Sequence, residues 1–497
     1  MDSTRQLWKR FWALASLFWR HEEKWKARGL LALLVILILG QTQFAVLFNE
    51  QTGEFTSALA ARDEQRFWTA IKLCLGLLIA AVPIYAFYFF VRDKLGIHWR
   101  RWLTHRFLDR YFSFRHFYEL NANNSIDNPD QRVAEDIATF TQRSLYFLLV
   151  IISSVLQLLA FSTVLWSISH ELVYFLIFYA LFGTFIVIFV FGQRLMQLNF
   201  NQLRREADFR FGLVRIRENA ESIAFYRGEG QELKQVGRRF NEVFNNFNRL
   251  ISAQFSLNLF QHGYFLLTLI IPSALIADQV LSGELEVGRA VQAAGAFAAV
   301  LNAISLIIEN FEGLSRFAAG IDRLDTLAQS LSGRSSTAPD PELAIVSVEA
   351  DHVKLDNVTL HTPNRERVLV RNLSFAIEPG QCLLIVGQSG SGKSSLLRAI
   401  AGLWSAGSGT IHRPGNGDML FLPQQPYMLL GSLRAQLLYP HRDFTCTDEE
   451  LLTLLARVNL PDLAHRVGGL DVEMDWQKVL SVGEQQRLAF ARLLLTR

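Results

Sequence analysis

The stretch CLLIVGQSGSGKSSLLRAIAGLW, Cys382 to Trp404, decides the fold of the C-terminal part of the chain. Its apolar start predicts a buried strand, its glycines predict a loop, and the apolar residues that follow at helical spacing predict a helix. Within it, GQSGSGKS fits the pattern G-x-x-x-x-G-K-[ST], the P-loop. We therefore predict an α/β domain that binds the phosphates of a nucleotide.

The residue types in this loop suit the binding of phosphate and Mg²⁺. Glycines let main-chain N–H groups approach the phosphates without a side-chain clash, and the following helix directs its positive end at the same anion. Lys393 is expected to reach the β and γ phosphates, and the Ser394 hydroxyl to bind Mg²⁺, which prefers oxygen ligands. The residues predicted to bind the nucleotide here are Gly387, Gln388, Ser389, Gly390, Ser391, Gly392, Lys393, Ser394 and Ser395.

The first 330 residues contain long apolar segments. Apolar residues make up 50% of the 497 residues, more than a soluble protein of this length usually contains. Each segment has close to the ~20 residues that cross a bilayer as a helix, the form that pairs every backbone amide in hydrocarbon. We predict six membrane-spanning helices, at 30–48, 69–91, 144–168, 172–191, 255–277 and 287–310.

The charges of the connecting loops predict the orientation. Arg20, Lys24, Lys26 and Arg28 precede the first segment, whereas the next loop carries four carboxylates against two arginines. The long loops after the second and fourth segments are rich in arginine. Because positive loops stay on the cytoplasmic side, the N-terminus and the nucleotide-binding domain are expected to be cytoplasmic.

Composition divides the chain into four parts. The N-terminus mixes tryptophan with lysine and arginine, which favours a helix in the lipid headgroup layer, with an ordinary amphipathic surface helix as the alternative. The polar stretch LSGRSSTAPDP predicts a linker. We predict an interfacial helix at 1–29, a transmembrane domain at 30–330, a linker at 331–345 and the nucleotide-binding domain at 346–497.

Charge and cysteine content exclude other classes. A formal net charge of +3 gives no support to a nucleic-acid partner, which requires a clustered excess of basic residues. The three cysteines, Cys74, Cys382 and Cys446, have neither the spacing of metal ligands nor that of a disulfide framework.

Two further motifs separate a kinase or a GTPase from a transport ATPase. FLPQQPYMLLGSLRAQLLYP places Gln424 after a predicted strand, and LSVGEQQRLAFARLLL opens a helix at Ser481. Ser481 and Glu484 also have the spacing of a helix capping box. In this order the motifs resemble the Q-loop and the signature of ATP-binding cassette (ABC) ATPases. The resemblance implies that Gln424 meets Mg²⁺ and the attacking water, and that Ser481, Gly483 and Glu484 belong to a site that contacts ATP bound by a second subunit.

Three stretches in the membrane part of the chain resemble one group within this family. NPDQRVAEDI (128–137), ENAESIAFYRGEG (218–230) and SRFAAGIDRL (315–324) are similar to a half-transporter group that includes peroxisomal fatty-acyl carriers, lysosomal cobalamin carriers and bacterial SbmA/BacA-like permeases. FWRHEEKWKARGLLAL looks more like the bacterial members. The resemblance implies an exporter-type fold, a homodimer in a bacterial inner membrane, and an amphipathic solute such as a peptide, a fatty-acyl compound or a corrinoid. It leaves the direction of transport open.

The sequence departs from the ABC pattern at three places. The stretch VTLHTPNRERVL, which corresponds to the adenine-stacking position upstream of the P-loop, offers His361 and no Phe, Tyr or Trp, and Val482 replaces a usual glycine. The 497 residues also end before the strand with Asp-Glu and before the switch histidine. We therefore expect this truncated domain to bind ATP weakly and not to hydrolyse it at transporter rates, with no catalytic residue among the 497. The alternatives are a proton-driven permease with a vestigial or regulatory nucleotide domain, and a membrane-anchored nucleotide sensor.

Polar residues inside the apolar segments are candidates for lining a solute cavity, because such groups are costly in hydrocarbon unless they face water or a partner. Hydrogen bonding between helices is the alternative for each one. The candidates are Gln157, His262, Gln292, Asn302 and Glu309, of which the Glu309 carboxylate is the strongest.

Overall fold

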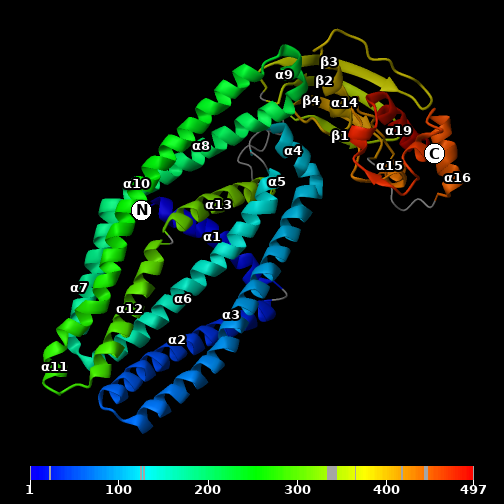
Figure 1. Ribbon diagram of the computed structural model, residues 1–497. Coiled ribbons are helices and arrows are strands. Elements are labelled where there is room, and N and C mark those ends of the chain that lie inside the picture. Colours follow the sequence, from blue (N-terminus) through cyan, green and yellow to red (C-terminus); the bar gives the residue numbers. More distant parts are fainter. Residues whose placement is uncertain are drawn as a thin grey trace. The chain divides into compact units, whose positions relative to one another are not determined.

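The computed structural model divides the chain into two compact units, Met1–Ser335 and Ser336–Arg497. It describes residues 2–21, 24–123, 126, 129–309, 311–332, 344–363, 365–415, 418–440 and 446–495. Figure 1 shows that the first unit is helical and that the second contains both strands and helices.

Long helices form much of the first unit. The longest of them exceed the ~20 residues that a bilayer span needs and extend beyond the apolar segments that the sequence predicts. The helices are α1 (Asp2–Arg20), α2 (Lys24–Ala60), α3 (Glu64–Phe112), α4 (His116–Asn123), α5 (Pro129–Gln131), α6 (Ile137–Ile168), α7 (His170–Ile186), α8 (Gln193–Glu218), α9 (Ala220–Tyr226), α10 (Glu229–Leu275), α11 (Ala277–Leu281), α12 (Val287–Glu309) and α13 (Phe311–Ser330). A short 3-10 turn, η1 (Ser113–Arg115), follows α3, and π-helical turns η2 (Arg132–Asp136) and η3 (Val187–Gly192) adjoin α6 and α7.

Five helical stretches of the described chain are long and apolar enough to cross a membrane: Lys24–Ala60, Glu64–Phe112, Pro129–Ile168, His170–Gly192 and Val287–Ile304. They coincide with five of the six predicted segments. The other segment, 255–277, lies almost entirely in α10, which is not among the five. Asn258, Gln261 and His262 lower its hydropathy, so its crossing of the membrane stays a prediction.

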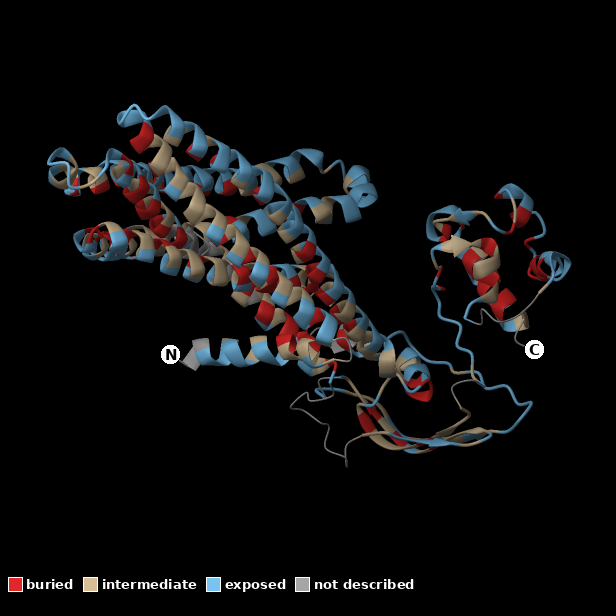
Figure 2. Ribbon diagram, turned by 90° about the horizontal axis from the view of Figure 1, so that it is seen from below, coloured by how far each residue is buried: buried red, intermediate tan, exposed pale blue. Residues whose placement is uncertain are grey.

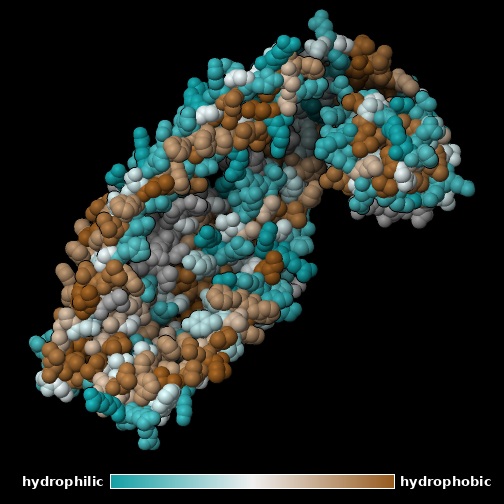
Figure 3. Space-filling view, viewed as in Figure 1, coloured by the Kyte–Doolittle hydropathy of each residue, from teal (hydrophilic) through white to brown (hydrophobic). Residues whose placement is uncertain are grey.

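The helical unit buries its apolar residues on inward faces and leaves many others exposed. Figure 2 shows buried residues along one side of the long helices and exposed residues along the other, and Figure 3 shows apolar patches on the outer surface. Ile79 is 75% exposed, Val82 68% and Phe178 67%. Exposed apolar residues on this scale are expected where lipid covers the protein.

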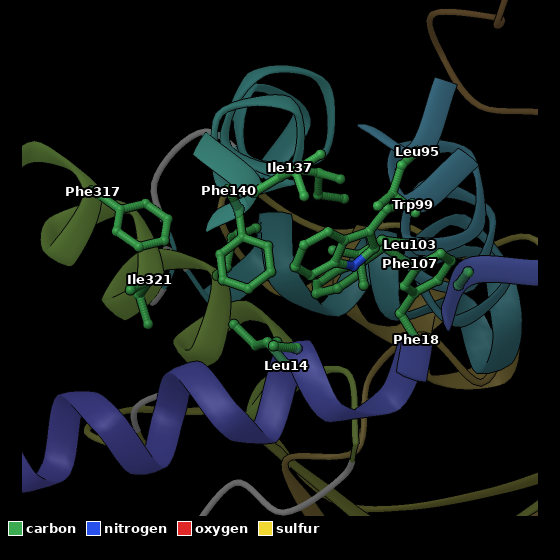
Figure 4. Packing of buried hydrophobic residues seen from close by; sticks show 14 of the residues in the cluster. Leu14, Phe18, Leu95, Trp99, Leu103, Phe107, Ile137, Phe140, Phe317 and Ile321 are labelled. Atoms are coloured by element: carbon green, nitrogen blue, oxygen red, sulfur yellow. The ribbon is translucent and has the colours of Figure 1, made fainter. Parts of the chain in front are cut away.

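The N-terminal helix is part of this core. Phe18 of α1 stacks on Trp99 of α3 with ring centroids 5.5 Å apart, and Phe11 lies 5.8 Å from Phe140 of α6. Figure 4 shows Leu14 and Phe18 directed toward the cluster that Trp99, Phe140 and other residues of α3, α6 and α13 form. Trp8 and Trp12 on the opposite side are more than half exposed, so α1 has one face packed on protein and one face free.

The second unit contains a four-stranded sheet with one helix packed against it. Strand order is β1 (Val346–Glu349), β4 (Gly407–Arg413), β2 (Val353–His361) and β3 (Val368–Ile377); β1 is parallel to β4, and β2 is antiparallel to both of its neighbours. Helix α14 (Lys393–Ile400) buries Leu396, Ala399 and Ile400 together with apolar residues of β2 and β4.

Helices with a separate core make up the rest of this unit. They are α15 (Leu433–Leu438), α16 (Asp448–Arg457), α17 (Leu463–Arg466), α18 (Trp476–Val479) and α19 (Val482–Leu495), with a two-stranded sheet of β5 (Gly431–Ser432) and β6 (Glu473–Met474). Trp476 is fully buried in this core, and its indole nitrogen donates a hydrogen bond to the Gly431 carbonyl over 2.7 Å.

Two predicted strands are wrong. Residues 382–386, before the P-loop, and 419–422, before Gln424, have no strand structure. A strand requires a neighbour that pairs with its backbone, and the described sheet is built from residues 346–413 without including the first of these stretches. Its side chains are consequently exposed, Leu384 by 82% and Val386 by 78%.

Candidate functional site

The P-loop forms a compact turn whose lysine folds back over it. The Lys393 ammonium donates hydrogen bonds to the carbonyls of Gly387 and Gln388, each over 2.7 Å. The Ser391 N–H donates to the same Gln388 carbonyl over 3.2 Å. Gly390 (φ 80°) and Gly392 (φ 93°) adopt left-handed backbone conformations that a residue with a side chain avoids. These two glycines therefore allow the turn that brings the lysine over the loop.

Strand β3 and helix α14 hold this turn in place. A methyl group at Gly392 would lie 3.3 Å from both the Leu369 Cβ and the Val370 Cγ2 of β3, so the loop passes close to this strand. Helix α14 begins at Lys393, directly after the loop. The sequence predicts the loop and the helix but gave no signal for the contact with β3, because that contact joins residues about twenty positions apart.

The loop surface is open to a ligand. Ser389, Gly390, Ser391 and Ser394 are exposed, and Gln388 is exposed beside them. Main-chain N–H groups at the start of α14, the helix dipole and the Lys393 charge are all favourable to an anion. The arrangement suits the binding of a polyphosphate, as the residue pattern predicts.

The second motif forms a helix cap. The Ser481 N–H donates to the Glu484 carboxylate over 2.8 Å, and the Glu484 N–H donates to the Ser481 hydroxyl oxygen over 3.3 Å. These reciprocal bonds are the capping box that the spacing predicts at the start of α19. Arg466 of α17 pairs with the second Glu484 oxygen at 2.7 Å. The Arg466 guanidinium and the Ser481 N–H together lower the pKa of Glu484 to about 2.

Exposure leaves the signature turn accessible. Ser481, Val482 and Gly483 are exposed, whereas Gln485 next to them is buried and donates to the carbonyls of Gln477 and Leu480. Gln485 thus holds the turn on its buried side, while residues 481–483 face solvent. Sequence reasoning identified Ser481, Gly483 and Glu484 but missed the supporting Arg466 and Gln485.

Gln424 lies next to the same helix. Its carbonyl accepts a hydrogen bond from the Gln486 side chain of α19 over 3.0 Å, and its own side chain is exposed. Further along, buried Arg492 donates to the carbonyls of Gln436 and Tyr427 over 2.7 and 2.9 Å. These contacts of Gln486 and Arg492 attach Gln424 and the segment after it to α19. The sequence around Gln486 and Arg492 does not indicate this role.

The structure does not bring the two halves of the predicted site together within the chain. Among the described residues, no hydrogen bond or ion pair joins the loop 387–395 to Gln424 or to the 481–484 turn. His361, the ring that the sequence offers at the adenine position, is the last residue of β2. Its carbonyl accepts a hydrogen bond from the Trp404 indole over 2.9 Å. Trp404, which follows the P-loop helix, is a second aromatic residue near this strand that the sequence interpretation missed.

The predicted cavity residues differ in environment. Gln292 is buried, Gln157 is half-buried and donates to Ser153, and His262 and Asn302 are exposed. The Glu309 side chain lies outside the described residues.

Comparison with known families covers both units. The family described as ABC transporter transmembrane region 2 matches residues 16–277, and the family described as ABC transporter matches residues 370–497, which include the P-loop and the signature turn. The chain belongs to the ABC transporter family. This confirms the predicted resemblance and makes the protein a multi-pass membrane protein, with the transmembrane region and the ATP-binding domain of an exporter-type half-transporter in one polypeptide.

Several relatives match this ABC transporter over nearly its whole length. An uncharacterized ABC transporter ATP-binding protein of Synechocystis is 47% identical over 487 residues, 95% of this chain and 73% of the relative. ABC transporter D family member 2 of Arabidopsis thaliana, a chloroplastic protein, is 37% identical over 558 residues, 99% of this chain and 79% of the relative. The human lysosomal cobalamin transporter ABCD4 is 30% identical over 507 residues, 94% of this chain and 83% of the relative.

Proposed function

We propose that two copies of this ABC transporter bind ATP and Mg²⁺ between them and use ATP to move an amphipathic solute across a bacterial inner membrane. Each nucleotide would contact the 387–395 loop of one copy and the 481–484 turn of the other. The N-terminus and the ATP-binding domain would be cytoplasmic.

The single observation that carries the proposal is the P-loop turn. Lys393 lies over the loop, Gly390 and Gly392 adopt the left-handed conformations that shape it, and residues 387–391 are exposed. The 481–484 turn is likewise exposed, and within one chain it makes no described hydrogen bond to the loop. Two surfaces of this kind, each incomplete alone, are expected to be completed by a second copy.

The residues available for Mg²⁺ fit a hard cation. The Ser394 hydroxyl is exposed at the start of α14, and the exposed Gln424 side chain supplies an amide oxygen. We propose that these two residues hold the ion. When bound, Mg²⁺ neutralises phosphate charge.

The solute class rests on the membrane unit and on the relatives. The polar residues His262 and Asn302, exposed on otherwise apolar helices, suit a solute with both apolar and polar parts. A fatty-acyl compound, a peptide and a corrinoid all meet this description, and one relative is named for cobalamin transport.

Nucleotide binding tests the proposal at its base. Lys393→Ala removes the ammonium that would pair with the phosphates, so we expect ATP affinity of the full chain in nanodiscs to fall at least about tenfold, about 1.4 kcal/mol. Lys478→Ala is the matched control, because Lys478 is 84% exposed and pairs with Asp475. Equal affinity of the two variants would refute the assignment.

Hydrolysis and driving force are tested separately. We propose that ATP hydrolysis by this ABC transporter requires Lys393, because phosphoryl transfer depends on positioning and on charge at the phosphates. Mg²⁺-dependent phosphate release that continues in Lys393→Ala would contradict this. For the protein expressed from its own gene, transport in inverted vesicles should require ATP; transport driven by a pH gradient without ATP would favour a proton-driven permease instead.

A further inference from the structure

A bridge of charges joins two turns of the helical unit. Arg66, in the first turn of α3, forms two hydrogen bonds with Glu54 of α2, at 2.5 and 3.0 Å, and two with Glu286, which directly precedes α12, at 2.8 and 3.3 Å. We call Arg66, Glu54 and Glu286 the Arg66 bridge. Figure 1 shows the α2–α3 turn and the α11–α12 turn at the same end of the helical unit.

Next to the bridge, α2 and α12 approach each other unusually closely. The Gly288 N–H donates to the Ser57 hydroxyl oxygen over 3.0 Å, and the Asn49 side chain donates to the Gln292 carbonyl over 3.0 Å. A methyl group at Gly53 would lie only 2.8 Å from the Gly288 carbonyl oxygen. Glycine at both positions therefore allows the backbones to touch. We call this contact, through Asn49, Gly53 and Ser57 of α2 and Gly288, Gln292 and Gly295 of α12, the α2–α12 interface.

The α2–α12 interface and the Arg66 bridge differ in burial, and this difference suits a contact that can open and close. The interface itself is small, polar and buried: Ser57 is 5% exposed and Gln292 7%. The bridge is partly exposed, with the side chains of Arg66 at 34% and Glu286 at 55%. Exposed ion pairs are each weak and exchange readily with water, so the bridge adds a modest preference for the closed contact rather than a permanent connection.

Resting on the proposed transport function, we propose that Arg66 is a positioning residue that keeps the α2–α12 interface closed, and that this interface opens when the ATP-binding domains take up nucleotide. A solute that leaves the membrane at this end requires helices to separate there. Among the described contacts of this end, the α2–α12 interface combines close backbone approach with hydrogen bonds that water can replace.

Thiol labelling measures the opening directly. With Cys74, Cys382 and Cys446 replaced by serine, Ser57→Cys introduces one buried thiol at the interface, and its reaction rate with a maleimide in nanodiscs reports how often the interface opens. Arg66→Gln should raise this rate about fivefold, the factor expected from losing two partly exposed ion pairs. Arg62→Gln, an exposed arginine of the same turn without an ion pair in the described structure, should change it less than twofold. If Arg66→Gln fails to insert, Glu286→Gln tests the same bridge from its other side.

A disulfide provides an independent measurement. The Asn49 Cγ lies 3.2 Å from a Cβ built at Gly295, which suits a disulfide between Asn49→Cys and Gly295→Cys once the Asn49 amide is removed. The bond should form rapidly under mild oxidation without nucleotide and more slowly with Mg²⁺-ATP, while labelling of the Ser57→Cys thiol should accelerate. Lys393→Ala should abolish both responses.

The outcomes are separable. Equal labelling of the Arg66→Gln and Arg62→Gln variants would overturn the role of Arg66, and labelling and disulfide rates that ATP leaves unchanged in a protein that binds ATP would overturn the opening. A protein that binds no ATP would refute the proposed function instead, and the nucleotide-free comparison of the two arginine variants would still decide whether the bridge holds the interface closed.

Discussion

Glu484 shows how a single residue serves both structure and the candidate site. Its carboxylate completes the cap of α19 with Ser481 and pairs with Arg466. A capping residue that also orders the serine proposed to contact the nucleotide links helix stability to the geometry of the candidate site. The functional and the structural interpretations of LSVGE are therefore compatible, because the same bonds support both.

Replacing Glu484 should loosen the start of α19. Glu484→Ala removes one half of the capping box and the ion pair, so we expect local stability to fall by about 1–2 kcal/mol at pH 7. Amide hydrogen exchange of 482–488 measures this. Glu378→Ala, an exposed glutamate in the loop after β3, is the control, and equal protection in both variants would argue against the cap.

The same carboxylate predicts a pH dependence. Its pKa falls from 4.5 to about 2 in the folded chain, chiefly through Arg466. A lowered pKa means that this stabilisation is complete above about pH 4.5 and is lost as the pH falls toward 2. The difference in exchange between the parent protein and Glu484→Ala should therefore shrink over this range, and a constant difference would contradict the assignment.

At the scale of elements, helix α19 supports the segment after Gln424, residues 427–438. The Gln436 side chain is fully buried and exchanges hydrogen bonds with the Leu429 backbone, while Arg492 of α19 donates to the Gln436 carbonyl and amide oxygen. Burial also lowers the pKa of Arg492. A buried guanidinium of this kind is tolerated because three carbonyl-type oxygens surround it.

Truncating Arg492 should release this segment. Arg492→Ala removes the guanidinium donor to the Gln436 and Tyr427 carbonyls, and we expect a loss of roughly 2–4 kcal/mol in local stability of 427–438. Arg487→Ala, on the same helix with a 2.9 Å bond to the Asn459 carbonyl, should cost under about 1 kcal/mol. Hydrogen exchange of the two variants compares them, and similar losses would show that Arg492 is not special.

Elements whose bonds are local could be predicted from the sequence. The P-loop helix starts at Lys393 and the capping box joins Ser481 to Glu484, as their spacing indicates, because each involves residues within one helical turn. The strand at 382–386 was predicted wrongly, since an apolar run shows β-propensity but not whether a partner strand is present. Arg66 and Glu286 are 220 positions apart, and no local pattern indicates such a pairing.

At the scale of the whole molecule, one polypeptide contains a membrane unit and an ATP-binding unit whose candidate site is divided between two surfaces. The membrane unit follows from apolar segment length, so five of its spans could be predicted from sequence with little else. The association of two copies depends on surfaces that are exposed in a single chain. The periodicity of the sequence does not show which residues of these surfaces meet.

The most direct test of this account is a nucleotide-dependent cross-link between two copies. One copy carries Ser391→Cys in the P-loop and the other Val482→Cys in the signature turn, both exposed positions, in a chain whose three cysteines are replaced by serine. We predict a disulfide between the two different copies that forms with Mg²⁺-ATP and is lost with Lys393→Ala. A cross-link of equal yield without nucleotide, or none with it, would contradict the proposal that two copies bind ATP between these surfaces.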